Sequence, residues 1–168
     1  MRRQFEVPDD SGFMAIVDPD VYHGFVDPNW TYDSLFAHFR NAMLQQQSLL
    51  LWGTGREDLW TVEVVTDDEA ERPTGHRRVT GPIRVTAGRL HLTGYESLTM
   101  AAQFPDVRLP EPHLQDLVVE LPVGQYAAEI IQLLDPDDDA TDAKPDFVIA
   151  LTSGQAAETW RNPPWHDM

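Results

Sequence analysis

The segment that decides the fold reads VTGPIRVTAGRLHLT and runs from residue 79 to residue 93. Residues 79–86 and residues 89–93 are each rich in strand-forming side chains, and apolar positions recur with the period of two that a β-strand shows. Ala87-Gly88 stands between the two runs, and a short connection with glycine is typical of a β-hairpin. The segment therefore predicts two antiparallel strands that pair across this turn.

Further strand-like segments lie on both sides of this hairpin, at a spacing of roughly ten residues. They cover residues 13–17, 21–26, 48–54, 60–64, 97–104, 117–121, 125–134 and 147–152. Prolines and glycines separate them, because both residues favour turns over a continued strand. Residues 1–11 and 153–168 are expected to be irregular tails of a single domain that spans residues 1–168.

One helix interrupts the strand pattern. Thr31 is suited to cap its N-terminus, and Asp33 places a negative charge where the helix dipole favours it. Apolar residues then recur every three or four positions until the pattern stops at residues 46–47. Together the elements predict an all-β fold, a β-sandwich or flattened antiparallel barrel, with one inserted α-helix.

The composition of the 168 residues excludes several classes of protein. Asp and Glu number 28 and Lys and Arg number 12, so the formal net charge is −16. This charge repels phosphate groups, and we therefore expect no direct binding to nucleic acid or to an anionic membrane. The chain has no cysteine, no apolar run of membrane-spanning length and no visible secretory leader, which predicts a cytoplasmic protein without disulfides.

Two acidic runs between predicted strands are the candidate contact sites for a partner. The residues concerned are Asp67, Asp68, Glu69, Asp135, Asp137, Asp138 and Asp139. A solvated loop is the simpler interpretation of each run, and a surface for a basic partner is the functional one. Trp160 and Trp165 belong to a proline-flanked tail that either packs on the sheets or adds aromatic contacts to the same interface.

The second acidic run also allows a calcium site. Asp135, Asp137 and Asp139 fall at positions 1, 3 and 5 of a calcium-binding loop, and Asp146 falls at position 12. Ala140 stands at position 6, where the sharp turn of such a loop favours glycine, and strands rather than helices are predicted on both sides. Calcium or ligand binding is therefore the alternative function, and we assign no metal ligand and no cofactor.

No arrangement of residues predicts catalysis. The six histidines lack metal-binding spacing, and the segment Gly53-Thr54-Gly55-Arg56 lacks the third glycine and the lysine of a phosphate-binding loop. We interpret this segment as a β-turn. No Gly-x-Ser-x-Gly motif marks a nucleophilic serine. We expect no catalytic residue and no enzymatic activity.

The order of the segments is similar to that of a known family. The stretches RRVTGPIRV at residues 77–85, GRLHL at residues 88–92 and LVVELPVGQY at residues 117–126 follow a helix and an apolar strand. This succession resembles the competence protein J family, whose members are small acidic cytoplasmic inhibitors of a DNA-entry nuclease. The resemblance extends from residue 13 to residue 152 and assigns no inhibitory residue by position.

The sequence as a whole predicts a non-enzymatic acidic protein that binds and neutralises a basic partner, such as a nuclease or a toxin. A high negative charge accelerates the encounter with a cationic surface, and a salt-sensitive affinity follows from the same charge. Self-association through an edge strand into a homo-oligomer is the remaining alternative.

Overall fold

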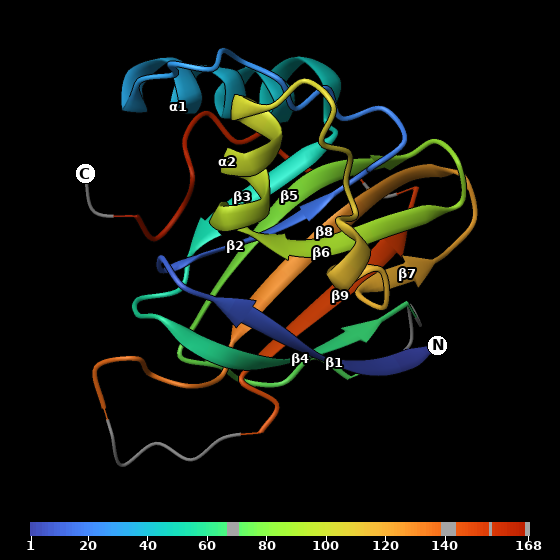
Figure 1. Cartoon of the computed structure of the whole chain (residues 1–168). Helices are drawn as coiled ribbons and strands as arrows, with labels where there is room; N and C mark the ends of the chain where they lie inside the picture. Colours follow the sequence, from blue (N-terminus) through green and yellow to red (C-terminus); the bar gives the residue numbers. More distant parts are fainter. Residues whose placement is uncertain (67–70, 139–143, 155, 167–168) are drawn as a thin grey trace.

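The computed structural model describes residues 1–66, 71–138, 144–154 and 156–166, and in these ranges nine strands form two sheets (Figure 1). The five-stranded sheet has the order β1-β4-β9-β8-β5, and the four-stranded sheet has the order β3-β2-β6-β7. The strands are β1 Arg2–Asp9, β2 Phe13–Val17, β3 Leu49–Gly53, β4 Asp58–Val65, β5 Arg77–Val85, β6 Arg89–Gly94, β7 Val118–Glu120, β8 Gly124–Gln132 and β9 Phe147–Ser153. The predicted sandwich-like all-β fold with an inserted helix is confirmed.

The two sheets approach each other along both sides, which gives the sandwich the character of a flattened barrel. On one side Arg3 of β1 donates from Nη1 to the carbonyl oxygen of Val118 in β7, at 3.3 Å. On the other side the backbone N–H of Arg84 in β5 donates to the carbonyl of Gln47, just before β3, at 2.9 Å. The apolar faces of both sheets enclose a single core whose largest fully buried side chains include Trp52 and Trp60.

The predicted hairpin between residues 79–86 and residues 89–93 is wrong. Strand β5 pairs with β8, whereas β6 pairs with β2 and β7, so the connection at residues 86–88 passes from one sheet to the other. The reason is a buried acceptor: one carboxylate oxygen of Asp18 accepts hydrogen bonds from the N–H of Thr86 at 2.8 Å and from its hydroxyl at 2.7 Å. This anchor holds the turn against the end of β2.

Two other expectations about strands need correction. Residues 1–11 are not an irregular tail, because Arg2–Asp9 forms β1, in which Phe5, Val7 and Asp9 are buried and the residues between them are exposed. The sheet is also not wholly antiparallel, since β4 and β9 pair in parallel, with Val62 opposite Phe147. Parallel strands cannot be joined by a tight turn and need a long connection. Here residues 66–146, which include β5 to β8, connect β4 to β9.

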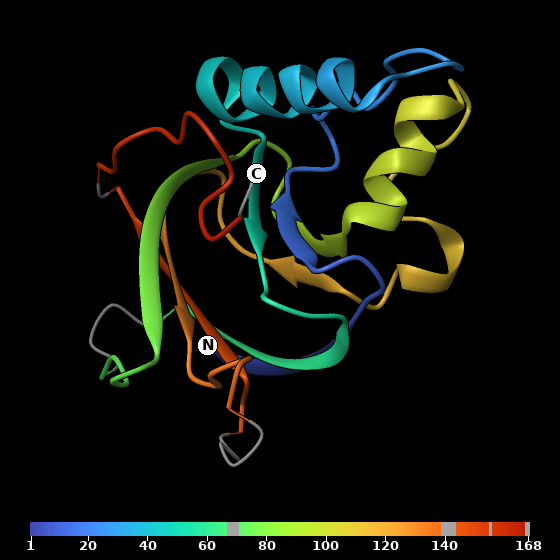
Figure 2. The same ribbon diagram turned by 90° about the vertical axis from the view of Figure 1, so that its left-hand side faces the viewer.

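The predicted helix is confirmed as α1, Tyr32–Asn41, which continues through a π-helical turn, Ala42–Gln46. Thr31 caps it as expected: its hydroxyl accepts from the N–H of Ser34 at 3.1 Å, and the Ser34 hydroxyl accepts from the N–H of Thr31 at 2.9 Å. Leu35, Phe36 and Phe39 form the buried stripe. Helix α1 lies across one end of the two sheets (Figure 1, Figure 2).

Two strands expected from short apolar runs do not form. Residues 97–103 belong instead to the helix α2, Tyr95–Gln103, which buries Leu98, Ala101 and Ala102 at helical spacing. Residues 21–26 are irregular, and a single 3-10 turn, Pro112–Leu114, precedes β7. Within the described part of the chain, no helix is long and apolar enough to cross a membrane.

Candidate partner-binding edge

One edge of the molecule gathers three segments that are far apart in the sequence. They are residues 53–58, residues 133–138 and residues 160–166, which lie on the left of Figure 1 and face the viewer in Figure 2. Arg56 Nη1 donates to the carbonyl of Pro136 at 3.3 Å, and the N–H of Gly53 donates to the carbonyl of Pro164 at 2.9 Å. We call these three segments together the acidic edge.

Two glycines allow the segments to approach this closely. A Cβ atom at Gly53 would lie 2.2 Å from the carbonyl oxygen of Trp165, so any side chain there collides with the tail backbone. Gly55 has φ +94°, and a Cβ there would lie 2.4 Å from Cγ of Pro136. The predicted β-turn at residues 53–56 is thus also a docking point for the loop and the tail.

The end of the tail is held by aromatic and cationic contacts. The guanidinium of Arg77 stands over the ring of Trp165 at 4.4 Å, which is a favourable cation–π geometry. Trp165 remains half-buried. The ring of His166 packs against Phe13 with centroids 4.5 Å apart, and its Nε2 lies 2.9 Å from the hydroxyl of Tyr32. The tail therefore packs on the protein and still presents an aromatic ring at the edge.

The second acidic run docks on Gly55 through Pro136, two residues from Gly53, on which the tail docks. Asp135 accepts the N–H of Asp137 at 2.9 Å, and its other oxygen lies 3.7 Å from Nδ1 of His76. Asp137 and Asp138 are exposed. Together with the half-buried Trp165 on the tail, they give the acidic edge both negative and apolar surface, a combination that fits recognition of a basic protein surface.

A shallow hollow of about 530 Å³ opens between the tail and the turns of the acidic edge. Its walls include Gly12, Phe13, Arg56, Trp165 and His166. Arg56 is committed to neighbouring groups, because its guanidinium pairs with Asp58 at 2.9 Å and also stands over the ring of Trp60 at 5.4 Å. The hollow therefore presents aromatic rings and backbone groups to a partner, whereas its Arg56 is already paired within the chain.

The structure brings together only some of the residues expected to contact a partner. Asp135, Asp137, Asp138 and Trp165 share the acidic edge. Trp160 is only 7% exposed, and its Nε1 donates to the carbonyl of Thr80 at 2.9 Å, so it supports the tail from beneath. Asp67, Asp68, Glu69 and Asp139 lie outside the described residues.

The carboxylate at position 12 of the possible calcium loop serves the sheet. Asp146 is 2% exposed, and its Oδ2 accepts the N–H of Thr61 at 2.8 Å. Both of its oxygens also lie 3.0 Å from Nζ of Lys144. Among the residues that the structure describes, no group of three histidine, cysteine or acidic side chains is placed to hold a metal ion.

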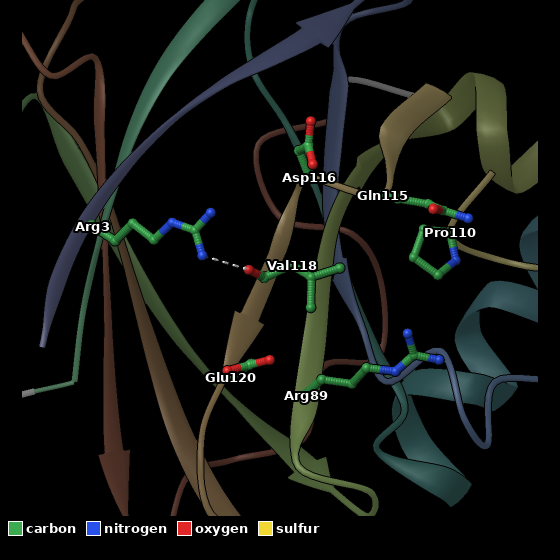
Figure 3. Close-up of a pocket in the computed structure, with 7 residues that line it drawn as sticks. All are labelled: Arg3, Arg89, Pro110, Gln115, Asp116, Val118 and Glu120. Carbon is green, nitrogen blue, oxygen red and sulfur yellow. Dashed lines mark hydrogen bonds between the residues drawn. The ribbon is translucent and has the colours of Figure 1, made fainter. Parts of the chain in front are cut away.

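A second hollow, of about 520 Å³, lies on another side of the molecule, where β1 approaches β7 (Figure 3). Arg3 and Arg89 both line it, and both are occupied within the chain. Arg3 donates to the carbonyl of Val118, and Arg89 forms hydrogen bonds of 2.9 and 3.0 Å with Asp20, which raise the pKa of Arg89. Charge is therefore largely balanced in this hollow, and it carries no functional assignment.

Residues that shape the acidic edge were not recognised in the sequence. Arg77 carries no local signal of its role, and it contacts Trp165 and Gln132. Asp9 fell within an expected tail, and it is a buried acceptor beneath the edge. The alternation of Phe5, Val7 and Asp9 was the available signal for β1, but two arginines and a glutamate obscured it.

Comparisons with known proteins find likeness in structure alone. No family description and no curated protein matches the chain. A solved structure titled "Crocagin biosynthetic gene J" overlaps with a TM-score of 0.61 at 15% identity, covering 92% of this chain and 98% of the other. ComJ from Bacillus subtilis, titled an inhibitor of the DNA degrading activity of NucA, overlaps with a TM-score of 0.53 at 11% identity, covering 90% and 95%. The resemblance to the competence protein J family is thereby confirmed for the fold.

Proposed function

We propose that this protein is a non-enzymatic inhibitor that binds and neutralises a basic partner, such as a nuclease or a toxin. The observation that carries the proposal is the overlap with ComJ, a nuclease inhibitor, over nine-tenths of both chains. An overlap this complete includes both sheets, so the comparison concerns the whole scaffold.

The charge of the chain supports the same function. A protein that acts on DNA needs a cationic surface for the phosphate backbone, and a net charge of −16 attracts such a surface. Exposed carboxylates raise the rate of encounter, while a few apolar anchors fix the orientation. The acidic edge offers both, with the exposed Asp137 and Asp138 on its loop and the half-buried ring of Trp165 on its tail.

The contact set follows from this arrangement. Asp135, Asp137, Asp138 and Trp165 form its centre, and Trp160 holds the tail in place beneath them. Asp67, Asp68, Glu69 and Asp139 belong to the proposed contact set by their charge alone. We place the encounter in the cytoplasm, where a cell needs protection from its own or an acquired nuclease.

A pull-down from the host lysate tests the proposal. The tagged protein is used at low salt and again at about 0.5 M NaCl, where surface electrostatics are largely screened. We expect one basic protein to be recovered in stoichiometric amount and to be lost or weakened at the higher salt. Recovery of no specific protein in either condition contradicts the proposal.

Two matched double variants then locate the contact. Asp137→Asn with Asp138→Asn removes two charges from the acidic edge, and we expect it to weaken partner binding about tenfold. Asp106→Asn with Asp116→Asn removes the same number of charges from exposed positions elsewhere. An equal loss in both pairs means that net charge alone acts, and the acidic edge is then not the contact.

A further inference from the structure

A narrow hollow of about 400 Å³ lies between the end of β1, the first turn of α2 and the 3-10 turn before β7. Its walls are mainly apolar and include Val7, Pro8, Met100, Leu114 and Leu117. Met100 is 41% exposed, so the apolar surface continues to the mouth. A long aliphatic group fits such walls, because burial of methylene groups is favourable. We call this hollow the α2 socket.

Three carboxylates surround the α2 socket. They belong to Asp10, Glu96 and Glu111, which come from β1–β2, α2 and the segment before the 3-10 turn. Glu96 is held in place, since its Oε1 accepts the N–H of Asp10 at 3.2 Å. Among the described residues that line the socket there is one histidine, His113, and no lysine or arginine, so acidic side chains outnumber basic ones within it.

An unsatisfied polar group lines the inside of the socket. Thr93 of β6 is 1% exposed, and its hydroxyl has no hydrogen-bond partner among the residues that the structure describes. Two residues earlier on the same face of β6, His91 binds the carbonyl of Leu117 through Nδ1 at 2.8 Å, and its buried Nε2 has no partner in the described part of the chain. Buried polar groups without partners are uncommon in native proteins, and a ligand with hydrogen-bond donors relieves this cost.

We propose that the α2 socket receives a lysine or arginine side chain of a protein partner. The aliphatic stem lies against Leu114 and Leu117, and the cationic head meets the carboxylates of Glu96 and Glu111. The combination of apolar walls, three carboxylates and a buried free hydroxyl selects a cation with a stem over an anion or a purely apolar group. The assignment of the cation to a protein rests on the proposed inhibitor function.

The position of the socket fits a second anchor for the same partner. Asp10 lines the α2 socket, and the next residues, Ser11 and Gly12, line the hollow at the acidic edge. Consecutive residues of one turn thus line the two hollows. A single basic protein that covers this turn reaches both, with its most inserted side chain in the socket.

The first test uses a small probe and needs no partner. The isotope-labelled protein is titrated with N-acetyl-lysine methylamide while amide resonances are followed by NMR, and N-acetyl-norleucine methylamide serves as the uncharged analogue. We expect the lysine probe to shift the amides of Gly94, Ser97 and Leu114, and the norleucine probe to bind about tenfold more weakly. Equal binding of both probes, or no shift at these amides, overturns the proposal.

Paired variants show whether the carboxylates are responsible. In Glu96→Gln with Glu111→Gln the shape of the socket is kept, and we expect the affinity for the lysine probe to fall about tenfold. Glu120→Gln with Glu158→Gln removes two exposed charges elsewhere and is expected to leave the affinity unchanged. A loss in both pairs overturns the socket as the binding site.

The pull-down separates this proposal from the proposed function. If a basic partner is recovered and the Glu96→Gln, Glu111→Gln variant retains it fully, the inhibitor function stands and the socket is not its anchor. If the lysine probe binds in the socket and no basic protein is ever recovered, the socket stands and the inhibitor function fails. A partner that binds the variant about tenfold more weakly supports both.

Discussion

At the scale of single residues, Asp9 links the turns on which the acidic edge is built. One carboxylate oxygen accepts the N–H groups of residues 11–13 at 2.7 to 3.1 Å. The other accepts the hydroxyl of Thr54 at 2.7 Å and the indole N–H of Trp60 at 2.8 Å. Asp9 is only 1% exposed, so the protein alone provides these donors, and the β1–β2 turn and the β3–β4 turn are fixed to one another.

We predict that Asp9→Asn lowers the free energy of unfolding by about 2–4 kcal/mol, because an amide cannot accept five hydrogen bonds through both terminal atoms. Urea denaturation followed by tryptophan fluorescence measures the change. Asp10→Asn, at the exposed neighbouring position, is expected to change stability by less than about 0.5 kcal/mol. An equally small effect at Asp9 contradicts the linking role.

His91 gives stability a dependence on pH. Burial lowers the pKa of His91, and the bond to the Leu117 carbonyl opposes this only in part, so the folded protein holds the imidazole neutral. The unfolded chain takes up a proton below its ordinary pKa of about 6.5. Stability is therefore unaffected well above that pH and is lost as the pH falls through it, by up to about 1.4 kcal/mol per pH unit.

We predict that His91→Gln reduces this acid-side slope. The free energy of unfolding is measured between about pH 5 and pH 7.5 for the wild type and the variant, and the difference between the two slopes isolates the histidine. His113→Gln, at an exposed histidine, is the control and is expected to keep the wild-type slope. Identical slopes in all three proteins contradict the prediction.

At single residues, the sequence does not show which polar side chains are buried. The turn that ends the strand at residues 13–17 is predictable from local chemistry, because the proline at position 19 restricts the backbone around it. That Asp18 is fully buried and fixes Thr86, sixty-eight positions away in sequence, depends on tertiary contacts. An aspartate that binds distant backbone groups has the same local signature as one that faces water.

At the scale of elements, the tail depends on the glycine at the end of β3. The main chain of Trp165 occupies the space where a Cβ of residue 53 would lie. The tail at residues 156–166 contains no helix or strand. Trp160 is buried in the core, and contacts with β3, Arg77 and α1 hold the residues that follow it. The attachment of this segment is thus separable from the stability of the sheets.

We predict that Gly53→Ala releases the tail while the sheets stay folded. Trypsin cleavage after the exposed Arg161 is expected to become about tenfold faster, with little change in far-ultraviolet circular dichroism. Cleavage is measured by mass spectrometry, with Leu59→Ala at an exposed position of β4 as the control. Unchanged cleavage in Gly53→Ala shows that the tail does not depend on this close approach.

Elements with a strong local pattern were predictable and those with competing patterns were not. Helix α1 combines a capping residue with a regular apolar stripe, and β2 and β3 are compact apolar runs. The sequence predicts a strand in place of α2 because the apolar stripe of Leu98, Ala101 and Ala102 is short and no side chain caps the N-terminus of the helix. Packing against β2 and β6 stabilises this segment as a helix, and local propensity carries no information about such tertiary contacts.

At the scale of the whole molecule, the net charge of −16 means that negative side chains repel one another in the compact state, which lowers the free energy of unfolding. We predict that raising NaCl from about 0.02 M to about 0.5 M increases the free energy of unfolding by about 1 kcal/mol, since the repulsion is screened. Chemical denaturation with urea, which is uncharged, measures it.

A charge-reduced variant is the control for this salt effect. Asp137→Lys with Asp138→Lys changes the net charge by four units, from −16 to −12, at two exposed positions. We expect its stability to respond less to the same change in salt. An equal or larger response contradicts self-repulsion as the cause.

The assembly of the two sheets was the least predictable feature. The sequence predicted the fold class from the number and spacing of strands, and the contact between β5 and β6 was assigned because the chain joins them directly. Hydrogen bonding to Asp18 and the pairing of β5 with β8 overrode that proximity. Strand order is a property of the whole chain, whereas turn chemistry is local.

The central place of β9 has a consequence for biosynthesis. This strand, the last one among the residues that the structure describes, joins the β1–β4 pair to the β8–β5 pair. While it is still inside the ribosome, the emerging polypeptide carries two unpaired apolar strand edges, which are templates for aggregation. Protection by a chaperone is needed most in this interval, and a product of premature termination before Phe147 is expected to be insoluble rather than weakly active.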